Sequence, residues 1–250
     1  MYFNDVHIYW YVFVIILGLL MGQFVDWMIR RLPDDKKIFS KEIFKDYKKN
    51  YKLNYLMMLI NAILYVAILY VCGIKDTFIA NLDLIKYYIL TPILLSIFVI
   101  DYKHQIIPNR LTLTLFEVGL VFAFIYGLSN IAISINMILG MVAGAGIFLL
   151  ITLIGGIVYG KEAMGFGDVK LMGCLGLWFG LSEIIIIALM SFLIGAILSI
   201  VLLVTRIKKS DEYIPFGPFI VLSTFIAMFV PYNIILVILM KIFTLGLYKG

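Results

Sequence analysis

The sequence predicts an all-α membrane protein, a polytopic bundle of transmembrane helices with about eight crossings and its N-terminus outside. Of the 250 residues, 64% are hydrophobic, and the mean hydropathy is +1.08. Only 14% of the residues are charged, whereas soluble domains carry about 25%. The apolar residues also gather in runs close to the ~20 residues that a helix needs to cross a bilayer core of ~30 Å.

Eight apolar runs are expected to form the helices of one membrane-embedded domain, residues 1–250. The sixth is too short to span alone, so it begins at or before Asp168 or forms a hairpin with the seventh across Ser182-Glu183. Pro231 should kink the last run or mark its outer end. The first run ends in Arg30-Arg-Leu-Pro without a small-residue cleavage site, which predicts a retained anchor. The runs are residues 8–29, 55–72, 84–100, 111–126, 135–159, 171–181, 184–205 and 216–240.

Lysine and arginine residues give the orientation. With the N-terminus outside, sixteen of the 20 basic residues fall in inside loops, which predicts a multi-pass protein of the cytoplasmic membrane. The net charge of +5 then reflects topology and contact with anionic lipid rather than nucleic-acid binding. The largest loop, residues 32–54, carries a short amphipathic stretch with Ile43, Phe44 and Tyr47 on one face, either lying on lipid or docking a substrate.

Small residues are expected to serve packing. The Gly140-x-x-x-Gly144 spacing lets two helices approach closely. Cys72 and Cys174 lie far apart in apolar runs and form no C-x-x-C pair, so we interpret them as packing residues and expect no metal site.

Two aspartates stand at the water-facing ends of apolar segments, Asp101 after Phe98-Val-Ile and Asp168 after Gly165-Phe-Gly. Ionisable groups at membrane depth are costly and usually serve function. The predicted topology puts both on the cytoplasmic side. Paired carboxyls hydrolyse peptides when one, deprotonated, activates water while the other, protonated, polarises the carbonyl. A close pair shares a proton and titrates as a unit, so the sequence predicts an aspartyl protease.

Glycines before the second aspartate fit this interpretation. Gly165 and Gly167 have no Cβ, so the backbone can bend before Asp168 and an extended substrate can pass close to it.

Four motifs together resemble the type IV prepilin peptidase family, the Gly-x-Gly-Asp intramembrane aspartyl proteases. They occur in the family's order across nearly the whole chain: Gly22-Gln-Phe with Arg31-Leu-Pro, Asp101-Tyr-Lys-His-Gln-Ile-Ile-Pro-Asn, Gly165-Phe-Gly-Asp-Val-Lys-Leu and Ile214-Pro-Phe-Gly-Pro-Phe. The resemblance implies that Asp101 and Asp168 are the catalytic dyad. It implies prepilin or pseudopilin substrates, whose basic leader is cut after a glycine that precedes a hydrophobic helix. Pro215, Phe216, Gly217 and Pro218 should line the substrate path as a wall.

The resemblance leaves a second activity open. Many bacterial members also methylate the new N-terminal amine with S-adenosylmethionine, whereas proteolysis needs no cofactor. Those members usually carry two C-x-x-C pairs between the first two helices, and this chain has no cysteine in residues 32–54. The chain also has Asp26 where the family typically shows asparagine.

Other polar residues are adjuncts with two interpretations each. Asp26 pairs with Arg30 one turn on, or helps bind the leader or methyl donor. Lys170 snorkels to the interface, or tunes Asp168 or contacts substrate. His104 is an interfacial loop residue, or modulates the pH dependence. Glu117 makes a hydrogen bond inside the bundle, or assists the site.

Three other functions are alternatives. A preflagellin-type peptidase would use the same dyad on archaeal substrates. A proton-coupled transporter or channel would use Asp101, Asp168 and Glu117 as an ion pathway, but such proteins often show paired repeats with midplane sites, which this sequence lacks. A structural pilus-assembly platform would tolerate Asp168→Asn.

Overall fold

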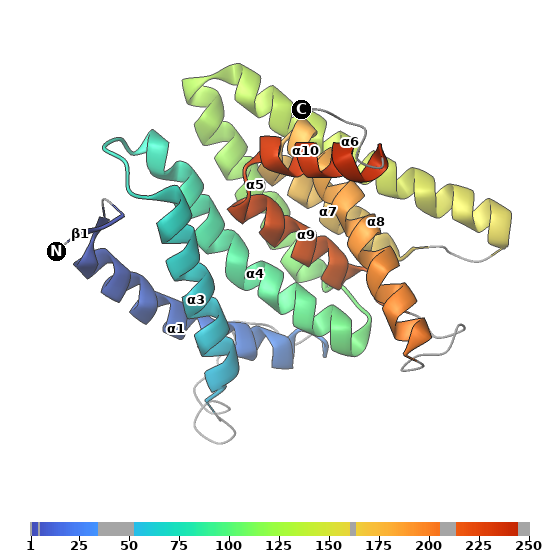
Figure 1. The fold of residues 1–250 in the computed structure, drawn as a ribbon, viewed down its shortest axis with the longest axis horizontal. Helices are drawn as coiled ribbons and strands as arrows, with labels where there is room; N and C mark the ends of the chain where they lie inside the picture. Colours follow the sequence, from blue (N-terminus) through green and yellow to red (C-terminus); the bar gives the residue numbers. More distant parts are fainter. Residues whose placement is uncertain (1, 5, 35–52, 161–163, 206–213, 245–250) are drawn as a thin grey trace. The chain divides into compact units, whose positions relative to one another are not determined.

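The computed structural model describes residues 2–4, 6–34, 53–160, 164–205 and 214–244, which are almost entirely helical (Figure 1). The chain divides into two compact units, Met1–Leu111 and Thr112–Gly250, and each unit is described separately. The predicted all-α class is confirmed. The amphipathic stretch around Ile43 lies outside the described residues, and the predicted orientation and single membrane domain stay predictions.

Unit 1 begins with a pair of two-residue strands, β1 (Tyr2–Phe3) and β2 (Val6–His7), which pair in antiparallel fashion. Three helices follow and pack against one another, with a 3-10 turn before the last of them (Figure 1). These elements are α1 (Ile8–Arg31), α3 (Tyr55–Cys72), η1 (Ile79–Asn81) and α4 (Leu82–His104).

Glycines allow α1 and α3 to approach closely. A Cβ added at Gly18 would lie 2.6 Å from Ala62 Cα, and one added at Gly22 would lie 2.5 Å from Met57 O. Asn61 Nδ2, fully buried, donates to Gly18 O at 2.9 Å across the same contact. The Gly22 of the first motif is therefore required by helix packing.

Unit 2 contains six helices in its described part. The first, α5, starts three residues before the boundary between the units. Helix α9 packs along α8, and α10 turns back across α8 (Figure 1). The helices are α5 (Asn109–Ser129), α6 (Ile131–Tyr159), α7 (Phe166–Phe179), α8 (Leu181–Val204), α9 (Gly217–Phe229) and α10 (Tyr232–Phe243).

The tightest helix contact in unit 2 joins α6 to α7. A Cβ on Gly176 would clash with the backbone oxygen of Gly140, and a Cβ on Gly144 would clash with Met172 O. These pairs run in opposite directions along the two helices, so α6 and α7 are antiparallel. The predicted packing role of Gly140 and Gly144 is confirmed.

Helix α5 also contacts α7, and two side chains of α7 donate hydrogen bonds to backbone oxygens of α5. Trp178 Nε1 donates to Leu115 O at 2.8 Å, and Cys174 Sγ donates to Thr112 O at 3.2 Å. Cys174 is buried and Cys72 is half-buried, both as free thiols, in agreement with the predicted packing roles.

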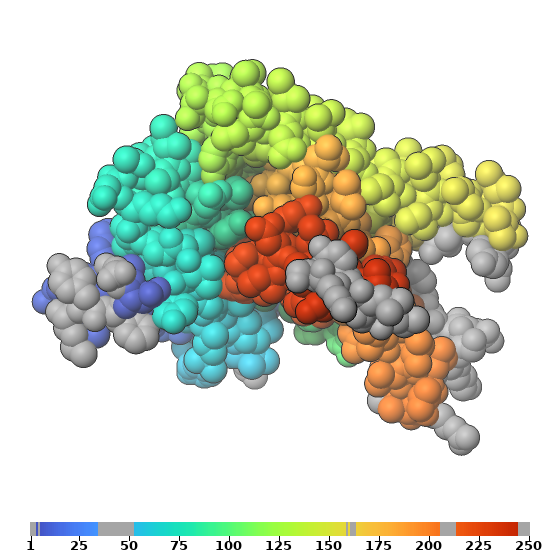
Figure 2. Space-filling model, turned by 45° about the horizontal axis from the view of Figure 1, so that its top comes forward, coloured from blue at the N-terminus to red at the C-terminus, as the bar shows by residue number. Residues whose placement is uncertain are grey.

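Six helices in the described residues are long and apolar enough to cross a membrane, and the chain is a multi-pass membrane protein. They are Ile8–Arg31, Tyr55–Cys72, Ile79–His104, Asn109–Ser129, Ile131–Val158 and Leu181–Val204. Helix α6 has 29 residues, about 43 Å of helix, and its last turns project past α7 and α8 (Figure 2). Ile157 there is 85% exposed, as expected of a side chain that faces lipid.

The expected count of eight crossings is not confirmed, because the sixth and eighth runs form shorter helices. Helix α7 has 14 residues and begins at Phe166, before Asp168, as one of the two predicted solutions required. Gly180, with φ of 81°, links it directly to α8, so the turn falls before Ser182-Glu183. The last run is broken at Pro231 into α9 and α10, as the proline predicted.

Candidate active site

Asp101 lies in the last turn of α4, and only 4% of its surface is exposed. The helix ends because Gln105 adopts a left-handed conformation (φ 56°, ψ 36°) and donates its backbone N–H to Asp101 O at 2.9 Å. The apolar run predicted that the helix ends at Ile100, but it continues one turn further. The residues after Ile100 are polar, yet they can still form a helix. Asp101 is therefore held by regular helix on both sides.

Asp168 lies in the first turn of α7 and is also 4% exposed. Gly165 is the N-cap residue, with an extended backbone (φ −67°, ψ 141°), and its carbonyl accepts the Asp168 N–H at 3.0 Å. A helix N-terminus carries partial positive charge. This position therefore favours a negatively charged carboxylate at Asp168.

The two glycines before Asp168 play different parts. Gly165 makes the bend into the helix, whereas Gly167 is already helical, so the predicted bend involves only the first of them. Neither has a positive φ. Lys170 is exposed, and its Nζ lies 5.2 Å from the centroid of the Phe166 ring, which agrees with a snorkelling side chain.

The segment Pro215–Pro218 leads into α9. Pro215, Gly217 and Pro218 are buried, and Phe216 is half-buried. The predicted non-helical entry is right for Pro215 and Phe216 but wrong for Gly217 and Pro218, which form the first turn of the helix. Proline is accommodated there because the first backbone N–H groups of a helix need no intrahelical acceptor.

Asp26 is the centre of a polar network in unit 1, which we call the Asp26 network. Its Oδ2 lies 2.8 Å from Arg30 Nε, which confirms the predicted pairing. Its Oδ1 accepts a hydrogen bond from Asn54 Nδ2 at 2.7 Å, and Gln23 Oε1 accepts the Asn54 backbone N–H at 3.2 Å. The network joins the end of α1 to the start of α3.

His104 and Glu117 are both exposed. His104 lies in the last turn of α4 rather than in the predicted loop, because the helix runs past Asp101. Glu117 is not turned into a packed interior, so the predicted bundle-facing hydrogen bond is not found. Within the described ranges, no group of three or more His, Cys, Asp or Glu side chains could hold a metal ion.

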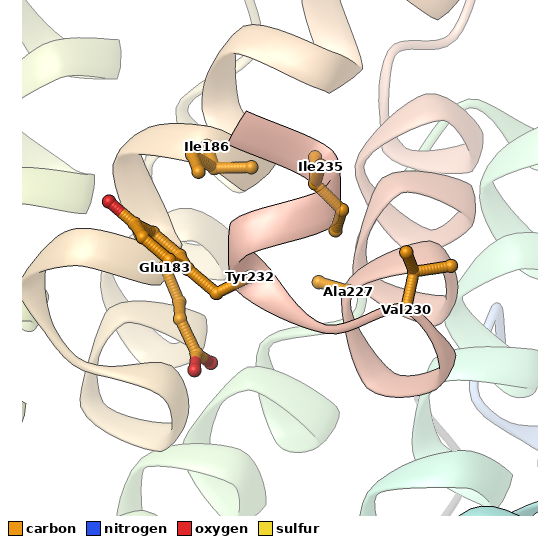
Figure 3. Close-up of a pocket in the computed structure, with 6 residues that line it drawn as sticks. All are labelled: Glu183, Ile186, Ala227, Val230, Tyr232 and Ile235. Carbon is orange, nitrogen blue, oxygen red and sulfur yellow. The ribbon is translucent and has the colours of Figure 1, made fainter. Parts of the chain in front are cut away.

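A small pocket lies beyond the end of α7 that is opposite to Asp168, and about 17 Å of helix separates Asp168 from that end. Ile186, Ala227, Val230 and Ile235 give it apolar walls, while the polar tips of Glu183 and Tyr232 point apart (Figure 3). Its volume of about 10 Å³ suits one water molecule at most. It is too small for a peptide or S-adenosylmethionine.

Sequence comparisons bear on both aspartates. Residues 88–200 match the model of the type IV leader peptidase family, and this range contains Asp101 and Asp168. The resemblance predicted from the motifs is therefore confirmed over this part of the chain. No solved structure matches the chain.

Several curated relatives carry the name prepilin leader peptidase/N-methyltransferase. The protein from Legionella pneumophila is 38% identical over 140 residues, that from Pseudomonas aeruginosa 37% over 138, and that from Aeromonas hydrophila 33% over 140. These stretches are 55%, 54% and 56% of this chain and 47%, 46% and 47% of the relatives. The chain thus spans about half the length of the curated relatives it matches.

Some residues around the candidate site were missed from the sequence. Asn54 could have been found, because an asparagine directly before an apolar run signals an N-cap, and its Oδ1 accepts the Met57 N–H at 3.3 Å. No local pattern predicted the left-handed Gln105, which depends on the path of the chain after α4. The aromatic contacts of Phe216 were missed because most of them join residues distant in sequence.

Proposed function

We propose that this chain is an intramembrane aspartic endopeptidase that removes the leader from type IV prepilins or pseudopilins at the cytoplasmic face of the inner membrane. Asp101 and Asp168 are its catalytic pair. The observation that carries the proposal is that two almost fully buried aspartates, each at the end of an apolar helix, both fall within residues 88–200, the range that matches the type IV leader peptidase family.

The proposed chemistry needs two carboxyls in different protonation states. The ionised carboxylate takes a proton from water, whose oxygen bonds to the scissile carbonyl carbon, and the protonated carboxyl gives its proton to the carbonyl oxygen. The tetrahedral intermediate then collapses as the C–N bond breaks, and the leaving nitrogen receives a proton. The products are a leader with a free carboxylate and a mature protein with a free amine.

Proximity would enforce this division of roles. Two carboxylates about 3 Å apart cannot both ionise, so a close pair holds one proton between them. The start of α7 favours negative charge on Asp168, whereas Asp101, in the last turn of α4, lacks that stabilisation. The two carboxyls are therefore not equivalent.

The substrate is expected to enter from the bilayer. A prepilin with a basic leader and a hydrophobic helix would rest with its junction at the membrane surface, where basic residues meet anionic lipid. Arg30 and Arg31 in the last turn of α1 agree with a cytoplasmic location for that end of the helix.

Methylation of the new amine is a separate proposal. The relatives named above carry N-methyltransferase in their name, and S-adenosylmethionine would supply the methyl group. Among the described residues we assign no side chain to that donor, and the cleavage step does not depend on it.

The test is co-expression of the chain with a prepilin, followed by separation of precursor and mature pilin on a gel. We expect the wild type to convert the precursor, and Asp168→Asn to leave it uncut while inserting at wild-type levels. Mass spectrometry of the mature N-terminus then distinguishes a free from a methylated amine. An inserted wild-type chain that cuts neither prepilins nor pseudopilins would refute the proposed function.

A further inference from the structure

Four phenylalanines of unit 2, one on each of α6, α8 and α9 and one at the N-cap of α9, form a cluster around the start of α9, which we call the phenylalanine cluster. The Phe216 ring centroid lies 5.9 Å from that of Phe148 in α6, 5.1 Å from that of Phe192 in α8 and 5.8 Å from that of Phe219 in α9. Phe148 and Phe192 also contact each other, at 5.3 Å. Phe216 is thus held by rings on three helices.

The register of the helices places this cluster at the depth of Asp168. Gly140 meets Gly176 and Gly144 meets Met172 along the antiparallel α6 and α7. One turn further on, Phe148 of α6 comes level with Asp168 of α7. Phe148 is fully buried, so the inner side of the cluster belongs to the packed interior of unit 2.

Gly195 of α8 makes room for the cluster. A Cβ at this position would lie 2.9 Å from Phe219 Cδ2 and 3.2 Å from Phe216 Cε2. Phe219 is only 8% exposed and its neighbour Ile220 is fully buried, so the ring has little freedom to retreat. A larger residue would therefore push the start of α9 away from α8.

We propose that Gly195 and the phenylalanine cluster are positioning residues that hold Pro215–Pro218 as an apolar wall at the level of Asp168, where it binds the hydrophobic segment of the substrate. This inference rests on the proposed function. The cluster presents carbon surface, Pro215 and Pro218 have no backbone N–H, and the half-buried Phe216 is the member of the segment that remains partly accessible. Such a wall suits an apolar helix rather than a basic leader.

The test compares two glycine-to-alanine variants of the purified full chain with a prepilin substrate. Gly195→Ala should raise KM about fivefold with little change in kcat, because it weakens binding that substrate and transition state share. Gly146→Ala is the matched control, since a Cβ there has no neighbour within 4 Å, and it should keep the wild-type KM.

The outcomes separate a positioning role from a merely structural one. A smaller folded fraction lowers the apparent kcat and leaves KM unchanged, so a fall in kcat alone, or an unchanged KM, overturns the inference. If Gly195→Ala does not insert, Phe192→Leu serves instead, with the same rise in KM expected and an unchanged KM counting against it. A wild-type chain that cleaves no prepilin overturns the proposed function itself.

Discussion

The two aspartates are held by different devices. Asp101 lies in the last turn of a 23-residue helix that packs against α1 and α3 in unit 1. Asp168 lies in the first turn of a 14-residue helix that packs against α6 in unit 2 through glycines. The first position is set by where a long helix stops, and the second by the register of a close helix contact. A change in the packing of α6 against α7 should therefore affect Asp168 more than a change at the end of α4 affects Asp101.

The largest effect is expected from replacing either aspartate, because cleavage should depend equally on both. Asp101→Asn and Asp168→Asn should each lower the cleavage rate by roughly 10³-fold or more, and the double variant should be no slower than either single one, because residues that act as a unit are not additive. The measurement is the rate of precursor conversion by purified enzyme. A double variant much slower than both singles would show that the carboxyls act independently.

Packing of α6 against α7 should give the next largest effect. Gly176→Ala sets a Cβ against the Gly140 backbone and should cost about 3 kcal/mol of stability or more. Gly173→Ala, whose Cβ would lie 3.1 Å from the Ala145 Cβ, should cost less, and Gly146→Ala almost nothing. Thermal unfolding in detergent gives the order. Equal stability of the three variants would mean that the glycine contact does not set the position of α7.

The Asp26 network offers the corresponding test in unit 1. Asp26→Ala removes the acceptor for Asn54 and the partner of Arg30, and should destabilise the protein by about 2 kcal/mol. Asp26→Asn keeps an acceptor oxygen and should cost about half as much. Thermal unfolding measures both, with cleavage expressed per folded molecule.

Cleavage per folded molecule should stay at the wild-type value in both Asp26 variants. Its loss in a fully folded Asp26→Asn protein would place Asp26 in the substrate or methyl-donor site instead of in a structural network.

The smallest effect is expected at the end of α4. Gln105 is a left-handed residue other than glycine, a conformation that costs an L-residue about 1–2 kcal/mol. Gln105→Gly should therefore stabilise the protein by roughly 0.5–1 kcal/mol after the loss of backbone entropy. Gln105→Ala, which keeps the strain and removes the side-chain contacts, is the control. A loss of stability in the glycine variant larger than in the alanine variant would contradict this account of the cap.

The sequence predicted most of this arrangement because its strongest signals are local. Apolar runs located the helices, Pro231 marked a break, and Asp26 with Arg30 showed a one-turn spacing. Hydropathy could not show that α4 continues past Asp101 or that α7 begins at Phe166, because both helices extend into polar residues. The hydrogen bond from Asn54 to Asp26 and the packing of Gly195 against Phe219 join positions distant in sequence, so no local pattern reports them.

Asp101 and Asp168 are proposed to act as one pair, and cross-linking shows whether they meet. Asp101→Cys and Asp168→Cys are combined in a chain with Cys72→Ser and Cys174→Ser, and the oxidised, digested protein is analysed by mass spectrometry. A disulfide forms only when the two Cα atoms come within about 7 Å. The control pairs Asp168→Cys with Asp83→Cys, which lies about 27 Å along α4 from Asp101. We expect a linked peptide from the first pair and none from the control. A first pair that oxidises no more than the control would contradict the proposed pairing.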